Sequence, residues 1–241
     1  MRMRRCVLGA IVAAGVMACM PSWLSAAIVQ GTGNTYLLIE AENETSITDP
    51  DNDTLIWQQV TDATANGGAA LRSPAGTSSA SAETLATYTL NFKTAGTYYF
   101  YVRYKNVDME NDANLGNNDS FWVGTSFGGT VSSTRFNLDQ PRSDAAYVIH
   151  NSGNNNVDTN TDNNSTLSLV VGAGDLNTDK IWAIGAREPG TQIDFILMST
   201  SNTLSDANVM ALATAPAVPE PASLGLLGLG AAGLLARRRR A

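Results

Sequence analysis

Short runs of alternating apolar and polar side chains fill most of the chain between residues 36 and 200, separated by clusters of Gly, Asn and Asp. A period of two is typical of β-strands that bury one face. Helical periodicity is confined to residues 205–212, where Ser205 is a candidate N-cap. Many short strands with almost no helix predict an all-β antiparallel sandwich. The predicted strands are residues 36–42, 84–92, 97–105, 120–124, 146–150, 166–171, 180–187 and 192–200.

The run at residues 97–105 indicates which strand face is buried. Alternation places its most apolar side chains on one side, which we expect to face the core: Tyr98, Phe100, Val102 and Tyr104. Trp182 shares a side with Ile184 and is also expected in the core. The Asn- and Asp-rich stretches at residues 107–119 and 151–165 predict long loops, where binding functions tend to lie.

The N-terminal segment has the order of a secretory signal peptide. Three arginines within the first five residues precede an apolar run at residues 7–18, and the small residues 25–27 follow. We therefore predict that residues 1–26 form a removable signal helix, with cleavage after Ala26 or Ala27. An alternative stays open, in which Val16 to Cys19 act as a loose lipoprotein box and Cys19 is lipidated. Both cysteines, Cys6 and Cys19, lie in this segment, which excludes disulfides from the mature chain.

The C-terminus carries a second apolar segment, which is too short for a permanent anchor. Residues 222–236 would span only about 22 Å as a helix, against a hydrocarbon core about 30 Å thick. Four glycines weaken this helix further. The four following arginines resist translocation, so we expect only transient membrane contact during export: Arg237, Arg238, Arg239 and Arg240.

A short polar signature precedes this apolar segment, namely Val218, Pro219, Glu220 and Pro221. With the glycine-rich run and the arginines, it resembles the PEP-CTERM sorting signal of Gram-negative bacteria. The resemblance implies cleavage by an exosortase-type membrane protease and delivery to the cell surface or extracellular matrix. The alternative is a weak membrane helix beside a proline turn. We divide the chain into a signal peptide (1–26), a β-sandwich (27–212), a linker (213–217) and a sorting signal (218–241).

Removal of both terminal segments makes the net charge of the protein more negative. The whole chain has a net charge of −7, whereas residues 27–218 keep 8 of the 15 basic and 21 of the 22 acidic side chains, which gives −13. This field repels nucleic acid and anionic lipid, and it suits divalent cations. The region has a normal size for one domain.

Five short motifs carry a second resemblance, and they occur in one order along the chain. Together they resemble the galactose-binding-like jelly roll of carbohydrate-binding modules of families six and thirty-five. They are Ile39 to Glu42, Gly67 to Leu71, Thr94 to Tyr98 running into Val102 to Tyr104, Asp119 to Val123, and Arg187 to Gly190 before Ile193 and Asp194.

This resemblance implies a structural calcium ion between the first and last strands, with Glu40, Glu42 and Asp194 as ligands. Residues two apart on a strand point the same way, and calcium takes six to eight oxygen ligands. The alternative is that these acids are solvated edge-strand charges. The segments 49–53 and 158–162 also space oxygens two apart, but they lack the glycine and glutamate of an EF-hand loop and are interpreted as turns.

Carbohydrate binding is the second implication of the resemblance. A sugar needs a flat apolar platform and polar groups that bond its hydroxyls. We predict Trp57 and Trp122 as platforms, with Asn66 and Asn118 as polar helpers; buried aromatics that fill the sandwich are the alternative. No pair of exposed aromatics flanks one loop, which departs from the family pattern.

Catalytic constellations are sparse in this sequence. His150 is the single histidine, and it lies at a strand end, where a surface or capped histidine is expected. We predict a non-enzymatic, exported cell-surface or matrix protein with a carbohydrate-binding-like module. The alternative is a structural or adhesive surface protein that uses the same fold without binding a defined glycan.

Overall fold

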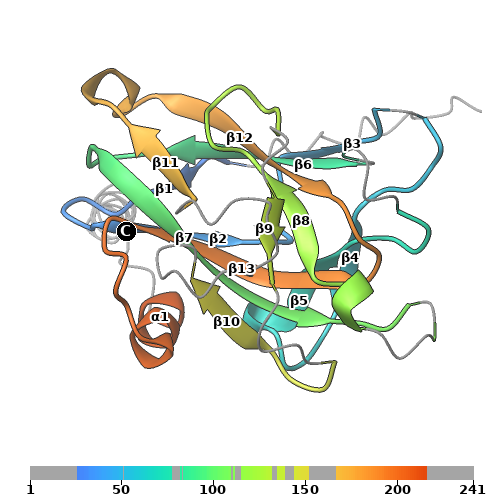
Figure 1. Ribbon diagram of the computed structural model, residues 1–241. Helices are drawn as coiled ribbons and strands as arrows, with labels where there is room; N and C mark the ends of the chain where they lie inside the picture. The colour runs from blue at the N-terminus through green and yellow to red at the C-terminus, as the bar shows by residue number, and fades with distance from the viewer. Residues whose placement is uncertain are drawn as a thin grey trace, which may run out of the picture.

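Two β-sheets lie face to face in the computed structural model (Figure 1). The structure describes residues 26–50, 52–77, 82, 84–109, 111, 115–131, 135–138, 144–151 and 167–215. Within these residues, one sheet has six strands and the other has seven. All pairings between these strands are antiparallel except that of β1 with β6. The predicted antiparallel sandwich is therefore confirmed.

The six-stranded sheet has the order β1-β6-β12-β8-β9, and β3 also pairs with β6. Its strands are β1 (Ile28–Val29), β3 (Ser46–Thr48), β6 (Leu85–Asn91), β8 (Ser120–Val123), β9 (Arg135–Asn137) and β12 (Asp179–Ala186). The seven-stranded sheet has the order β10-β7-β13-β5-β4, with β11 against β7 and β2 against β13. Its strands are β2 (Tyr36–Glu40), β4 (Gln58–Thr61), β5 (Ala69–Arg72), β7 (Gly96–Asn106), β10 (Val148–Asn151), β11 (Ser168–Val171) and β13 (Thr191–Ser199).

Each of the eight predicted strands is present, with ends that differ by a few residues. The five strands that the pattern did not predict are β1, β3, β4, β5 and β9, and none is longer than four residues. Runs this short carry too little alternation to stand out from loops. Three short 3-10 helices lie in the connections: η1 (Asn66–Gly68), η2 (Leu115–Asn117) and η3 (Ala173–Asp175).

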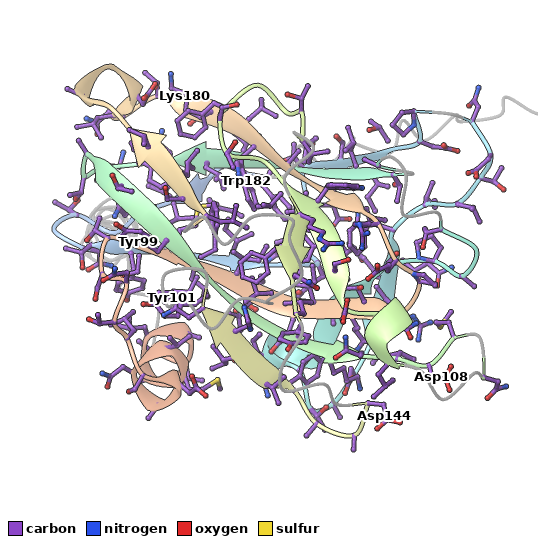
Figure 2. The ribbon with its side chains drawn as sticks, in the orientation of Figure 1. Tyr99, Tyr101, Asp108, Asp144, Lys180 and Trp182 are labelled. Carbon is purple, nitrogen blue, oxygen red and sulfur yellow. The ribbon has the colours of Figure 1, made fainter. Side chains whose placement is uncertain are left out.

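The core lies between the sheets, and the predicted face of β7 points into it. Tyr98, Phe100, Val102 and Tyr104 are all fully buried. Trp182 of β12 is also buried, as predicted, and Figure 2 shows it between the sheets. Its indole Nε1 donates to the carbonyl of Gly124 at 2.6 Å. Burial of large aromatic side chains from both sheets supplies the main hydrophobic stabilisation of the sandwich.

A second apolar cluster lies on the outer face of the seven-stranded sheet. Helix α1 (Asp206–Ala213) covers this face, packing Val209 and Ala213 against Tyr101, Phe195 and Leu197. Ser205 is the N-cap, as predicted, and its Oγ accepts from the backbone N–H of Asn208 at 3.3 Å. Among the described residues, no helix is long and apolar enough to cross a membrane. The predicted signal helix and C-terminal apolar helix lie outside those residues, apart from Ala26.

Candidate functional site

Trp122 lies on the outer face of the six-stranded sheet. Phe121 and Val123 on either side of it are buried in the core, so alternation along β8 turns Trp122 outward. The Trp122 side chain is half-buried. The guanidinium carbon of Arg187 lies 5.4 Å from the centre of the Trp122 ring. In register, Trp122 faces Gly185 of β12 on one side and Arg135 of β9 on the other.

Hydrogen bonds connect Arg187, which lies over the Trp122 ring, to its neighbours. Arg187 donates to the hydroxyl of Ser120 and to the carboxylate of Glu188. The second carboxylate oxygen of Glu188 accepts from Ser120 Oγ at 2.6 Å and from the Asp119 N–H at 3.1 Å. Asn118 donates to the Pro189 carbonyl at 2.5 Å. We call this group the Trp122 cluster: Asn118, Ser120, Trp122, Arg187 and Glu188.

Three buried polar atoms of the Trp122 cluster have no hydrogen-bond partner. They are Nε1 of Trp122, Nε of Arg187 and Oδ1 of Asn118, two donors and one acceptor. Leaving a buried polar group unpaired costs about 1–3 kcal/mol. Such an unpaired group is a place where a water, an ion or a ligand can supply the missing bond.

A tight turn positions Asn118. Gly190 has a φ of +77°, and a Cβ at this position would lie 1.9 Å from the Val107 carbonyl and 3.0 Å from Asn118 Nδ2. Only glycine fits this close approach. The Asn118 carbonyl accepts from Asn106 Nδ2 at 2.8 Å and from Thr191 Oγ1 at 2.9 Å, so its backbone is fixed from two strands.

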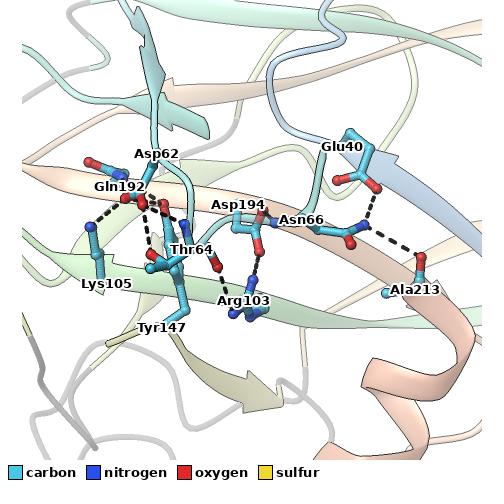
Figure 3. A network of polar contacts seen from close by, with 10 residues as sticks. All are labelled: Glu40, Asp62, Thr64, Asn66, Arg103, Lys105, Tyr147, Gln192, Asp194 and Ala213. Carbon is cyan, nitrogen blue, oxygen red and sulfur yellow. Dashed lines mark hydrogen bonds and ion pairs between the residues drawn. The ribbon is translucent and has the colours of Figure 1, made fainter. Parts of the chain in front are cut away.

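A group of acidic side chains lies at the end of β2 in the other sheet, in the connection that follows it and on β13, and we call it the acidic cluster: Glu40, Glu42, Glu44 and Asp194. Glu40 ends β2, and Asp194 occupies a bulge in β13, where the pairing with β7 shifts between Ile193 and Phe195. Both Asp194 oxygens are occupied, one by the Arg103 guanidinium and the other by the Asn66 N–H at 2.8 Å. Asn66 Nδ2 donates to Glu40 at 2.5 Å (Figure 3).

The glutamates of the acidic cluster retain oxygens that a cation could bind. Oε2 of each glutamate is buried without a hydrogen-bond partner. Burial, together with repulsion from Glu40, Asp194 and Glu44, raises the pKa of Glu42 to about 7. Burial also raises the pKa of Asp194 to about 6, although Arg103 opposes this shift.

The predicted calcium ligands therefore fit a cation only in part. Glu40 and Glu42 retain buried oxygens, whereas Asp194 is held by donors of the protein itself. No three acidic, His or Cys side chains within the described ranges converge closely enough to hold a metal ion. Glu44 was not predicted as part of this group, although it follows Glu42 at the same two-residue spacing. Its Oε1 accepts a hydrogen bond from Gln59 Nε2 at 2.8 Å.

A polar network continues from the acidic cluster along the same sheet face (Figure 3). Oδ2 of Asp62 accepts from Lys105 at 2.5 Å, Gln192 at 3.0 Å and Tyr147 at 3.2 Å. The bond from Lys105, which has the largest effect, and those from Thr64 hold the pKa of Asp62 well below its usual value. Arg103 and Lys105 lie 4.7 and 5.0 Å from the centre of the Tyr147 ring. Sequence patterns gave no signal for this network, because its members come from four separate segments.

The structure separates the four predicted sugar-binding residues. Trp122 and Asn118 belong to one cluster, whereas Asn66 lies with the acidic cluster on the other sheet. Trp57 cannot be the surface platform that we predicted, because only 1% of its surface is exposed and it packs in the core, as the alternative of buried aromatics expected. Arg187, Glu188 and Ser120 were not predicted as site residues, although all three belong to motifs that carried the resemblance.

The remaining candidates have structural roles where they are described. Asp49 accepts from the N–H groups of Asn52 at 2.9 Å and Thr54 at 2.8 Å, so it closes a turn as interpreted. The segment 158–162 lies outside the described residues. His150 was expected at the surface or as a cap, but it is 5% exposed and meets the Phe136 ring edge-on at 5.4 Å.

Comparison with solved structures finds distant likenesses to carbohydrate-binding modules. The C-terminal CBM6 of LamC, a marine laminarinase from Zobellia galactanivorans, matches at 14% identity with a TM-score of 0.41, over 68% of this chain and 98% of that one. A family 35 module from Clostridium thermocellum matches at 11% with a TM-score of 0.42, over 70% and 100%. The GH26-CBM35 β-(1,4)-mannanase of Podospora anserina matches at 13% with a TM-score of 0.43, over 71% and 29%.

The C-terminal segment gives a specific match. No curated protein matches the chain in sequence. Residues 217–240 match the model of the PEP-CTERM protein-sorting motif. This range contains the predicted signature and the four arginines, which lie outside the described residues. The chain is therefore an exported, surface-directed protein that carries a sorting signal for exosortase-type membrane machinery.

Proposed function

We propose that this surface-directed protein binds an extracellular carbohydrate at the Trp122 cluster. The observation that carries the proposal is the outward-facing, half-buried Trp122 ring with the Arg187 guanidinium carbon 5.4 Å from its centre, where Trp122 Nε1 and Arg187 Nε both lack a hydrogen-bond partner. A pyranose offers an apolar C–H face and hydroxyls that both donate and accept. Those two sides of a sugar match an indole face and the polar groups beside it.

The chemistry of the cluster argues against two other ligand classes. The −13 charge of residues 27–218 opposes nucleic acid, which needs a basic surface. A purely apolar ligand would leave the three polar atoms unpaired, at about 1–3 kcal/mol each. A polyhydroxylated ligand removes this cost, because each hydroxyl can donate or accept as the nearest protein atom requires.

The predicted calcium ion remains part of the proposal, with a structural role. Glu40 and Glu42 would hold it through the oxygens that lack partners, and Asp194 would join only by giving up a donor. Calcium would supply the positive charge that three neighbouring, half-buried glutamates lack.

The test is binding of the exported, tail-cleaved protein to a panel of neutral and acidic polysaccharides by affinity electrophoresis. We expect retardation in at least one gel, and its loss in Trp122→Ala and Arg187→Gln. Arg72→Gln is the matched control, because Arg72 also has a buried Nε without a partner but lies on the seven-stranded sheet. No retardation in any gel, or equal retardation in all variants, contradicts the proposal and favours a purely structural or adhesive role.

The calcium part is tested separately. Thermal melts of the same protein in calcium and in chelator should differ, with the higher melting temperature in calcium. Identical melts remove calcium from the proposal and leave carbohydrate binding intact.

A further inference from the structure

Helix α1 belongs to the folded sandwich rather than to the segment that leads into the sorting signal. Val209 and Ala213 are one helical turn apart and share a face, and both are buried against the seven-stranded sheet. Figure 2 shows Tyr101 of β7 on the side of the sheet where α1 lies. The sequence-based division at residue 212 therefore cuts through a packed element.

Polar contacts fix both ends of α1 to the sheet. At the start, the Tyr101 hydroxyl donates to the Ser201 carbonyl at 3.0 Å and accepts from the Leu204 N–H at 2.9 Å. At the end, Asn66 Nδ2 donates to the Ala213 carbonyl at 3.5 Å, while the Asn66 N–H bonds Asp194 at 2.8 Å (Figure 3). The last turn of the helix is thus tied to the buried strand β13.

Little chain remains between this fixed point and the sorting signature. Five residues, 214–218, separate Ala213 from Pro219. Fully extended, they span at most about 18 Å. A membrane protease that cuts near Pro219 must therefore work close to the folded surface for as long as α1 stays docked.

We propose that α1 is a fixed joint between the sandwich and its sorting signal, and that its docking sets how far the signal can reach into the protease. Two consequences follow. The processed protein keeps α1 as its C-terminal cap, because the cut lies beyond Ala213. Shortening the connection hinders processing, and undocking α1 relieves that hindrance by returning the residues of the helix to the connection.

The experiment follows processing of the full-length chain in a host that cleaves such signals, as the ratio of precursor to product on immunoblots. Deletion of residues 214–216 should slow processing several-fold, and a ten-residue Gly/Ser spacer at the deletion should restore it. Adding Val209→Asp to the deletion should also restore processing, because a buried charge undocks the helix. Ala211→Asp is the matched control, since Ala211 is exposed on the same helix, and it should not restore processing.

Two results would overturn the fixed joint. One is normal processing of the deletion variant. The other is a deletion that the spacer rescues but Val209→Asp does not. If the Val209→Asp chain is degraded, Val209→Ser in the same deletion must give partial rescue for the proposal to stand. Mass spectrometry of the wild-type product adds an independent check, because a product that ends before Asp206 contradicts the retention of α1.

Discussion

Arg103 forms an ion pair with Asp194, whose side chain is completely buried. The second Asp194 oxygen accepts a backbone N–H, so the carboxylate has one donor at each oxygen. Arg103→Gln would leave this charge buried and unpaired, and we expect a loss of about 3–5 kcal/mol in the free energy of unfolding. Chemical denaturation of the tail-cleaved protein measures it.

Lys180→Gln is the control for that variant. Lys180 pairs with Asp175, and these two side chains are 26% and 28% exposed. We expect a change of about 0–1 kcal/mol, because solvent screens such a pair. Equal losses in the two variants would show that burial of Asp194 does not set the strength of its pairing.

Trp57 and Trp122 should respond differently to truncation. Trp57→Ala leaves a cavity in the core, and we expect a cost of about 3–5 kcal/mol in folding stability. Trp122→Ala removes a half-buried outer side chain, so its main effect should be on carbohydrate binding. Thermal melts and affinity electrophoresis of both variants check this, and a reversal of the two effects would contradict our assignment.

Stability without calcium should fall as the pH rises toward neutrality. The pKa of Glu42 rises on folding from 4.5 to about 7, so its contribution is full below pH 4.5 and is lost as the pH rises through 7. Asp194, with a pKa raised to about 6, acts in the same direction. Melting temperatures across this range in chelator should decline, and Glu42→Gln should flatten the decline. An unchanged slope in Glu42→Gln would contradict the assignment to Glu42.

Gly190→Ala should damage the Trp122 cluster through the backbone. The added Cβ would collide with the Val107 carbonyl and crowd Asn118 at a φ that disfavours alanine. We expect a loss of more than about 1 kcal/mol in stability, with weaker carbohydrate binding. Gly174→Ala is the control, because a Cβ added there would have no neighbouring atom within 4 Å, and its melt should stay close to wild type.

The pattern of apolar and polar residues predicted those features of the fold that a single contiguous segment determines. Alternation identified the buried face of β7, and a serine before a helical run identified the N-cap of α1. The sorting signal could also be predicted from the sequence, because its signature, apolar run and arginines follow one another in one contiguous segment.

Contacts between distant segments could not be predicted in this way. Trp57 follows an Asp-rich turn and looks like a loop residue, yet packing in the core between the sheets buries it. The partners of Asp194, Arg103 and Asn66, are 91 and 128 positions away along the chain. Likewise, Arg187 meets Trp122 only because β12 pairs with β8. Sheet register, rather than residue type, decides which polar groups share a site.

Tryptophan fluorescence during a saccharide titration tests carbohydrate binding at Trp122 most directly. Trp57 and Trp182 are 1% and 0% exposed, so among the described tryptophans only Trp122 can report a ligand at the surface. With a polysaccharide or oligosaccharide that retards the wild-type protein, we predict a saturable emission change that is absent in Trp122→Ala. Saturable binding that leaves the emission unchanged, or that persists in Trp122→Ala, would contradict a carbohydrate site at this residue.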